Sequence, residues 1–193
     1  MKNEILVETF RLTRIDKDQR QKILDRFFTI HQKIFSGANY NKLRKEILET
    51  RAEDITLTLF KKDNYDDVGF CILYRYTIIY EGRSLTVFRS DAGLLPKYRH
   101  NLSTLSIGLS YILKYKLCHP FKEMIYFECY VHPSSYHLLH KYYSLVYPSP
   151  ILEMPEKYKN VISHLRQYFS LKPALSGSEF CAFSDWVTIE HDQ

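Results

Sequence analysis

Three strand-like runs that follow one another closely constrain the fold of this chain more than any other feature of its sequence. They read ITLTLFKK, DVGFCILYRYTIIY and LTVFRSDAGLL, and the short segments KDNYDD and EGRS join them. Parallel neighbours need a crossover of about a dozen residues or more, so connections this short favour antiparallel pairing. The sequence therefore predicts a meander of three antiparallel strands.

Helical periodicity lies on both sides of this meander. A first strand is expected in EILVETFRLTRI, and Asp16 then leads a helical pattern with a shared apolar face. A second, short helix is expected in YNKLRKEILET. After the meander, apolar residues recur at helical spacing and predict one buried stripe. The stripe consists of Leu102, Leu105, Leu109, Ile112, Leu113 and Leu117.

The remaining third of the chain continues the alternation. We expect a strand in EMIYFECYV, a short helix in HPSSYHLLHKYY and a short strand in SLVY. A proline-rich connector then leads to an amphipathic helix, EKYKNVISHLRQYF, and to a closing strand, FCAFSDWVTIE. The element order is β, α, α, β, β, β, α, β, α, β, with one added helix before the final strand.

Composition bounds the class of protein. A length of 193 residues with 45% hydrophobic content fits one globular domain with a substantial core. The net charge of +5 is spread among acidic residues, so we expect no nucleic-acid partner. The chain shows no membrane-spanning run and no signal-peptide core, so we expect a cytoplasmic location and no membrane partner.

Metal binding and covalent catalysis find little support in the sequence. Zinc-ligand residue types occur at Cys118, His119, Cys129 and His132, but without the paired spacing of a structural zinc site, so no metal is expected. The chain shows no serine or cysteine on a glycine-flanked turn, so hydrolase chemistry ranks low. The four cysteines are scattered, which suits reduced thiols.

The stretch LLPKYRHNLST, residues 94–104, joins the last strand of the meander to the next helix. A helix N-terminus attracts phosphate through its unpaired N–H groups and its dipole, and Lys97 and Arg99 add positive charge. Together with the element order, this stretch resembles the GNAT N-acetyltransferase superfamily, whose members bind acetyl-CoA and transfer its acetyl group to an amine. A second resembling stretch, PSSYHLLHKYYSL, spans residues 133–145.

The resemblance implies a fold class, α/β with a mixed, mostly antiparallel central sheet flanked by helices, and a single acyltransferase domain over residues 1–193. It also implies acetyl-CoA as acyl donor, with its pantetheine arm along the strand end and its pyrophosphate in the following turn. The residues so assigned to cofactor binding are Gly93, Leu94, Leu95, Arg99, His100, Asn101, Leu102, Ser103 and Thr104. Leu102 and Thr104 stand where the family usually has glycine. A second interpretation therefore stays open, a GNAT-like binding or regulatory module without transferase activity.

Direct transfer to an amine needs a base for the acceptor ammonium and an acid for the departing thiolate. Asp91, near the end of its strand, and Glu128, on the next strand, are the candidate bases; either can equally be a structural carboxylate. The resemblance places His140 where the family has a tyrosine that protonates the departing thiolate, and a shifted register would give that place to Tyr142 or Tyr143. The acceptor amine is unidentified. We also expect the segment Pro148–Ser178 to form a homodimer contact or a lid, because its helix has an apolar face that must be covered. This face consists of Tyr158, Val161, Ile162, Leu165 and Phe169.

Overall fold

The computed structural model describes residues 5–37, 39–62, 66–99, 104–130, 133–142, 146–149, 151–173, 181–182 and 187–189. Two compact units make up the chain. Unit 1 consists of Met1–Glu128 and Thr188–Gln193, and unit 2 consists of Cys129–Val187. None of the described helices is both long enough and apolar enough to cross a membrane.

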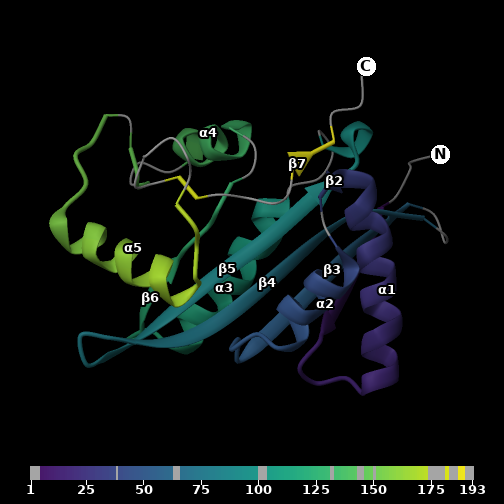
Figure 1. Ribbon diagram of the computed structural model, residues 1–193, viewed down its shortest axis with the longest axis horizontal. Coiled ribbons are helices and arrows are strands. Elements are labelled where there is room, and N and C mark those ends of the chain that lie inside the picture. The colour runs from purple at the N-terminus through teal and green to yellow at the C-terminus, as the bar shows by residue number, and fades with distance from the viewer. Residues whose placement is uncertain are drawn as a thin grey trace. The chain divides into compact units, whose positions relative to one another are not determined.

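A five-stranded sheet forms the centre of unit 1 (Figure 1). In spatial order its strands are β1 (Ile5–Arg11), β3 (Asp54–Lys62), β4 (Asp66–Tyr80), β5 (Arg83–Leu94) and β6 (Glu123–Tyr126). The first four pair antiparallel, whereas β6 runs parallel to β5. This confirms the predicted fold class and the three-stranded meander, which corresponds to β3, β4 and β5.

The β4–β5 connection is as tight as the sequence predicts. Tyr80 pairs with Arg83, so only two residues form the loop. Both have positive φ, 48° at Glu81 and 73° at Gly82. Two left-handed residues match the right-handed twist of the flanking strands, which is the usual solution for a two-residue hairpin. The glycine supplies this conformation at no steric cost.

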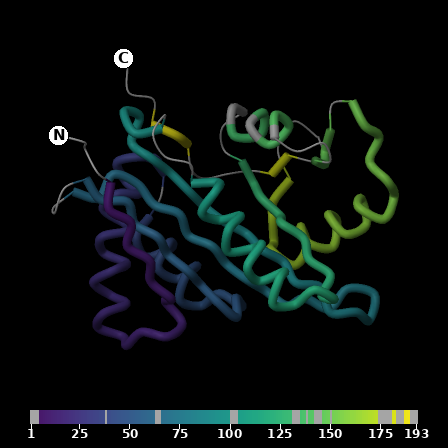
Figure 2. Tube along the Cα trace, turned by 180° about the vertical axis from the view of Figure 1, so that it is seen from behind, coloured from purple at the N-terminus to yellow at the C-terminus, as the bar shows by residue number. Residues whose placement is uncertain are grey.

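Two helices cover one face of the sheet and a third covers the other. In Figure 1, α1 (Lys17–Ile34) and α2 (Tyr40–Leu48) lie in front of the strands. Seen from behind in Figure 2, α3 (Thr104–Cys118) lies in front. As predicted, Asp16 caps α1, and its carboxylate accepts the Gln19 N–H at 2.8 Å.

The helix α3 departs from the predicted apolar stripe. Ile107 packs against a core cluster that includes Leu94 and Tyr98, the latter in the short 3-10 helix η1 (Pro96–Tyr98). Leu113 and Leu117, however, are 60% and 73% exposed, and Leu105, Leu109 and Ile112 are only partly buried, so the predicted apolar stripe lies on a helix without forming a buried face. Leu102 lies outside the described residues. Regular spacing specifies a helical face but not how much of its length the sheet covers.

The C-terminal third also differs from the predicted strands. The strand β6 ends at Tyr126, five residues before the end of the expected strand EMIYFECYV, and the described Val146 and Tyr147 belong to no strand. Of the expected closing strand, the described residues 187–188 form β7 (Val187–Thr188), which pairs with β2 (Phe35–Ser36) and not with the central sheet; residues 180, 183–186 and 190 lie outside the described residues. A strand needs a partner as well as a suitable sequence, and among the described residues 127–130 and 146–147 belong to no paired strand.

The described part of unit 2 includes the helices α4 (Pro133–Tyr142) and α5 (Glu156–Tyr168). Both were expected from the sequence. Leu165 is fully buried on α5, and the rings of Tyr147 and Tyr158 stack with centroids 5.2 Å apart. The homodimer contact or lid expected at α5 stays a prediction.

Candidate functional site

The strands β5 and β6 separate part-way along their length, and the candidate site lies where they do. Their parallel pairing runs from Leu85 with Glu123 to Phe88 with Tyr126. One further backbone bond follows, from the Phe127 N–H to the Phe88 carbonyl at 2.8 Å. The Ser90 N–H then donates to the side-chain carboxylate of Glu128. A side chain thus replaces the backbone partner, and beyond this point no strand among the described residues pairs with this side of β5, which we call its open edge.

The backbone groups along this edge can be assigned from the hydrogen-bond alternation of the sheet. The Leu95 N–H donates to the Val68 carbonyl at 2.9 Å, which directs Leu95 toward β4. In an antiparallel ladder the intervening residues point their N–H and C=O groups the other way, so Ala92 and Leu94 face the open side. The Leu94 carbonyl there accepts a hydrogen bond from Nε of Arg99 at 3.2 Å.

An edge of this kind fits an extended ligand that carries amide groups, because such a chain can pair with it as an additional strand would. The sequence assigned this role to Gly93, Leu94 and Leu95. By the alternation, Leu94 and its neighbour Ala92 present their backbone groups to the open side, whereas Gly93 and Leu95 pair with β4.

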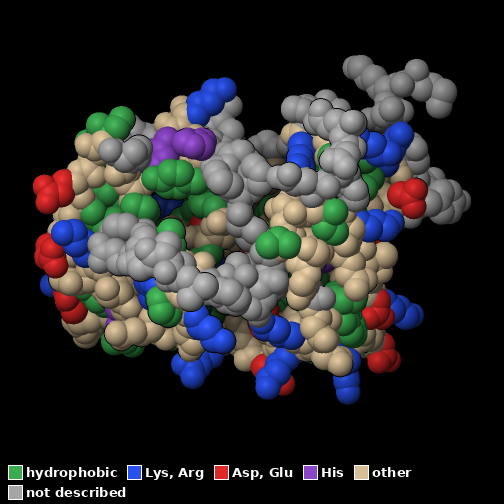
Figure 3. Space-filling model, turned by 45° about the horizontal axis from the view of Figure 1, so that its top comes forward, with side chains coloured by type: hydrophobic (Ala, Val, Ile, Leu, Met, Phe, Trp, Pro, Cys, Tyr) green, Lys and Arg blue, Asp and Glu red, His purple; other side chains and the backbone are tan. Residues whose placement is uncertain are grey.

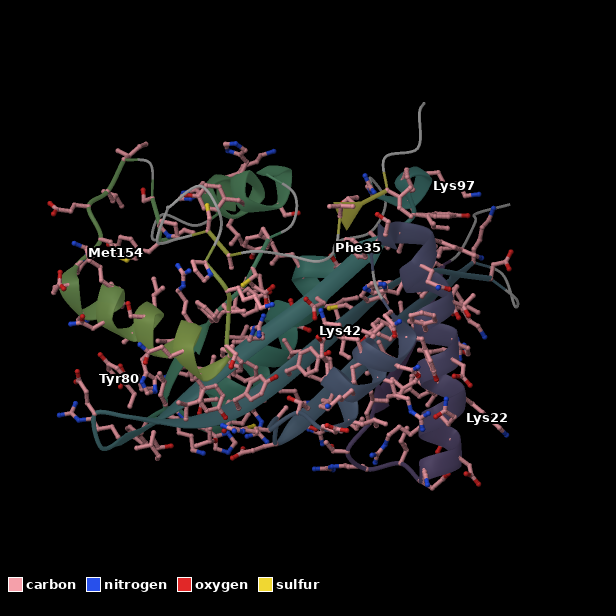
Figure 4. The ribbon with its side chains drawn as sticks, in the orientation of Figure 1. Lys22, Phe35, Lys42, Tyr80, Lys97 and Met154 are labelled. Carbon is pink, nitrogen blue, oxygen red and sulfur yellow. The ribbon has the colours of Figure 1, made fainter. Side chains whose placement is uncertain are left out.

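Gly93 has a different reason to be glycine. A Cβ built there would lie 2.9 Å from Cγ2 of Ile34 and 2.9 Å from Cε2 of Phe35, too close for either contact. Figure 4 labels Phe35 at the end of α1. The absence of a side chain at Gly93 therefore lets the end of α1 approach β5 closely.

The structure brings the two candidate bases into electrostatic contact. Burial, and to a smaller extent the negative charge of Asp91, raise the pKa of Glu128 to about 8 against the opposing effects of Ser90 and Arg89. Burial also raises the pKa of Asp91, while Arg89 lowers it. Since the two carboxyls interact, their protons belong to the pair. Such raised pKa values near an open edge are typical of groups that exchange protons in catalysis.

Two more titratable side chains of β4 surround the pair. Burial, assisted by Glu128 and Asp91, raises the pKa of the Cys71 thiol to about 12. Burial and the charge of Asp91 likewise raise the pKa of Tyr74. Both groups therefore stay protonated at neutral pH, and Cys71 is unsuited to act as a nucleophile.

A pair of hydroxyl groups completes the point of separation. The Ser90 Oγ and the Tyr126 hydroxyl lie 2.7 Å apart. Sequence analysis missed both residues, although a signal was present: the polar letters RSD interrupt an otherwise apolar strand, and only the aspartate was considered. The position of Tyr126 beside Ser90 depends on the parallel register of β6 and could not be found from spacing.

The expected pyrophosphate site is described only at its ends. Arg99 follows η1, and its side chain bonds to the Leu94 carbonyl, while Thr104 is the first residue of α3. His100, Asn101, Leu102 and Ser103 lie outside the described residues. The assignment of this turn to phosphate binding stays a prediction.

The expected acid, His140, lies on α4 in unit 2, whereas Asp91 and Glu128 belong to unit 1. Its ring packs edge-on against Tyr136 at a centroid distance of 4.6 Å. Its Nε2 is buried and has no hydrogen-bond partner among the residues that the structure describes. The side chain of Tyr142 lies outside the described set. The role of either residue as acid stays a prediction.

Charge and metal-ligand residues are dispersed over the described part of the chain. On the face shown in Figure 3, Lys and Arg side chains occur at many separate places and alternate with Asp and Glu. Within the described ranges, no group of three or more His, Cys, Asp or Glu side chains could hold a metal ion.

No family model matches this chain, and no curated protein matches it. Solved structures do. The chain is similar to a ribosomal-protein-alanine N-acetyltransferase from Brucella melitensis biovar Abortus 2308, with a TM-score of 0.46 and 10% identity over 79% of this chain and 100% of that one. It is also similar to an aminoglycoside N-acetyltransferase in complex with CoA, with a TM-score of 0.47 and 10% identity over 80% of this chain and 95% of that one.

A third similar structure is the aminoglycoside 6'-N-acetyltransferase of Acinetobacter baumannii, with a TM-score of 0.45 and 11% identity over 78% of this chain and 98% of that one. The solved structures named here are all N-acetyltransferases.

Proposed function

We propose that this protein is an acyl-CoA-dependent N-acyltransferase that moves an acetyl group from acetyl-CoA to an amine by direct transfer. The observation that carries the proposal is the position of Glu128. Its carboxyl group closes the point where β5 and β6 separate, beside Asp91 and at the start of the open edge. A proton acceptor and a binding edge thus meet at one place.

The open edge of β5 supports the binding of the acyl donor. When bound, acetyl-CoA supplies an activated thioester. The backbone groups of Ala92 and Leu94 would hold the amides of its pantetheine arm. Arg99 and the N-terminus of α3 would attract its phosphates. A thioester near Glu128 would then be within reach of a proton acceptor.

The carboxyl pair supports the chemistry on the acceptor side. An alkylammonium ion, with a pKa near ~10.4, must lose a proton before its nitrogen can attack a carbonyl carbon. Glu128, with its pKa raised to about 8, can take that proton near neutral or slightly alkaline pH. Asp91 adds negative charge that favours a cationic acceptor. His140 is proposed to give a proton to the departing thiolate.

The binding part of the proposal is tested by calorimetric titration of the protein with acetyl-CoA and with CoA. We expect both ligands to bind and to raise the melting temperature. The Arg99→Glu variant should bind both much more weakly, because a negative charge replaces a positive one beside the proposed phosphate site. The Arg14→Glu variant, in the turn before α1, is the matched charge reversal and should bind normally. A wild-type protein that ignores millimolar acetyl-CoA would contradict the proposal.

The catalytic part is tested by following thiol release from acetyl-CoA with a panel of primary amines. A positioned base contributes about a hundredfold to ten-thousandfold in rate, so Glu128→Gln should lower kcat by at least the smaller factor. If acetyl-CoA binds normally but no amine releases CoA, the protein is better described as a GNAT-like binding or regulatory module.

A further inference from the structure

We propose that the outward face of α3 and the turn after it dock onto a membrane surface that carries anionic phospholipids. The part that enters the membrane consists of three exposed apolar side chains, Leu113, Leu117 and Phe121. Lysine side chains beside them contact the lipid phosphates. Such docking needs no membrane-spanning run, whose absence led to the expectation of no membrane partner.

Tyr115 fixes which way α3 faces. Its ring lies against that of Phe88 on β5, with centroids 5.4 Å apart, and Cζ of Arg75 on β4 lies 5.0 Å from the Tyr115 ring centre. Successive residues of an α-helix are rotated by about 100°, so the residues two before and two after Tyr115 point almost directly away from the sheet. These residues are Leu113 and Leu117, which agrees with their exposure of 60% and 73%.

Apolar side chains therefore occupy two sides of α3. One side is covered, since Ile107 packs against the core cluster that includes Leu94, and Tyr115 contacts Phe88. A helix that only covers a sheet needs a single apolar stripe, with polar residues on the opposite side. The second apolar side does not serve packing within unit 1, and exposed apolar surface of this kind is typical of a site of interaction.

The turn after α3 holds a fully exposed aromatic side chain in place. The Lys116 ammonium donates to the Lys122 carbonyl at 2.8 Å, and the Lys122 N–H donates to the His119 carbonyl at 3.1 Å. Phe121, which precedes Lys122 in this anchored turn, is 100% exposed. Contact of a whole phenyl ring with water is unfavourable, so the turn presents a side chain that gains free energy by entering an apolar phase.

The charge of this region favours an anionic partner. No acidic residue occurs between Asp91 and Glu123, whereas five basic residues do: Lys97, Arg99, Lys114, Lys116 and Lys122. Lys114 and Lys116 are exposed, and they flank the outward leucine row on its two sides, each about a quarter of a turn from its centre. This arrangement is typical of helices that lie in a membrane interface, where lysine stems stay beside the apolar region and the ammonium groups reach phosphate.

A second copy of the chain fits this surface less well. A two-fold contact would bring the same lysines of both molecules together, and like charges across an interface repel. A bilayer also accepts protruding apolar side chains without a pocket of matching shape, and Phe121 protrudes completely. Charge and exposure thus both favour a lipid surface.

The direct test is flotation of the full chain with vesicles of phosphatidylcholine alone and with vesicles of phosphatidylcholine and phosphatidylserine. We expect binding to the mixed vesicles to be at least about tenfold tighter, because each lysine near an anionic surface strengthens binding several-fold. Added salt should weaken binding to the mixed vesicles. A protein that ignores the mixed vesicles at low salt would overturn the inference.

Variants at exposed positions locate the contact. Leu117→Gln and Phe121→Gln should each weaken vesicle binding by about tenfold, because an apolar side chain no longer leaves water. Ile151→Gln, at a side chain that is 89% exposed in unit 2, is the matched control and should bind like the wild type. Lys114→Gln should weaken binding several-fold, whereas Lys22→Gln, on α1 (Figure 4), should not. Equal effects of these variants and their controls would contradict docking through α3.

Insertion of the aromatic ring has its own measurement. In Phe121→Trp, adding the mixed vesicles should move tryptophan emission to shorter wavelength by more than in the wild type, because the new indole leaves water. Unchanged emission would contradict insertion of this turn. The melting temperature without vesicles should be the same in Phe121→Gln and the wild type, which separates loss of docking from loss of folding.

Sedimentation of the lipid-free protein tests the competing occupant. We expect no self-association that depends on Leu117 or Phe121. If the wild type forms a dimer that Leu117→Gln and Phe121→Gln abolish, the surface is a contact between copies and the inference is wrong. None of these measurements uses acetyl-CoA, so the inference and the proposed function can fail independently of each other.

Discussion

Glu128 lowers the stability of the folded protein because its carboxyl group is buried beside Asp91. An exposed glutamate has a pKa of 4.5, whereas burial and Asp91 raise that of Glu128 to about 8. Between these values the unfolded chain releases a proton that the folded chain keeps. Stability is therefore lost as the pH rises from 4.5 to about 8, and the loss is complete above that range. Active sites that need a group with a shifted pKa are commonly less stable for that reason.

We therefore expect Glu128→Gln to be more stable than the wild type at alkaline pH. Below pH 4.5 the difference in free energy of unfolding between the two proteins should be constant. From pH 4.5 to about 8 the variant should become progressively more stable relative to the wild type. Urea unfolding at a series of pH values measures this gain. Glu123→Gln, at an exposed position of β6, should run parallel to the wild type. A constant difference between Glu128→Gln and the wild type at every pH would show that Glu128 ionises normally.

His140 is the second residue with a specific expectation. If it gives a proton to the departing thiolate, His140→Ala should lower turnover by about a hundredfold or more, with little change in acetyl-CoA affinity. His137→Ala, one helical turn earlier and exposed, is the matched control. Full turnover of His140→Ala across the neutral pH range would move the role to a neighbouring tyrosine or to water.

At the scale of elements, α1 and β5 depend on one close contact. Gly93→Ala would place a Cβ 2.9 Å from both Ile34 and Phe35, so we expect it to destabilise the protein by about 1–3 kcal/mol. Gly108→Ala, on α3, meets nothing within 4 Å and should stabilise by roughly 0.5–1 kcal/mol through helix propensity. Thermal unfolding of the two variants compares them directly. Equal changes in stability from the two substitutions would show that the end of α1 does not pack closely against Gly93 of β5.

Local sequence predicted the helices and the meander because each depends on contacts between nearby residues. Asp16 marks the start of α1, and Gly82 marks the hairpin. The end of β6 could not be predicted, because FECY continues a strand-like pattern and only the separation from β5 ends the pairing. For the same reason the sequence suggested Asp91 and Glu128 individually, but not the contacts that join Glu128 to Ser90.

At the scale of the whole molecule, acid stability depends on His31. This side chain on α1 is fully buried, and its ring lies 5.6 Å from that of Phe27, 5.1 Å from Phe35 and 5.5 Å from Phe70. Burial lowers its pKa to about 4. Below the ordinary pKa of 6.5, His31 binds a proton in the unfolded chain but stays neutral in the folded chain until the pH approaches 4. The contribution of neutral, buried His31 to stability is thus full above pH 6.5 and is lost as the pH drops toward 4.

We expect His31→Leu to flatten the stability profile between pH 6.5 and 4. The wild type should lose at most roughly 3 kcal/mol over this range from His31 alone. Denaturant unfolding at several pH values measures both slopes. His119→Leu, at a partly exposed histidine after α3, should keep the wild-type slope. A wild-type slope in His31→Leu would assign the acid sensitivity to other groups.

The open edge of β5 also bears on how the protein behaves in concentrated solution. A strand with unpaired backbone groups is a template on which a strand from a second molecule can add. Whatever occupies the groups of Ala92 and Leu94 competes with that event. A tightly bound ligand would thus protect the protein from aggregation as well as take part in the reaction. Protein without the ligand should aggregate at a lower temperature on warming than protein saturated with it.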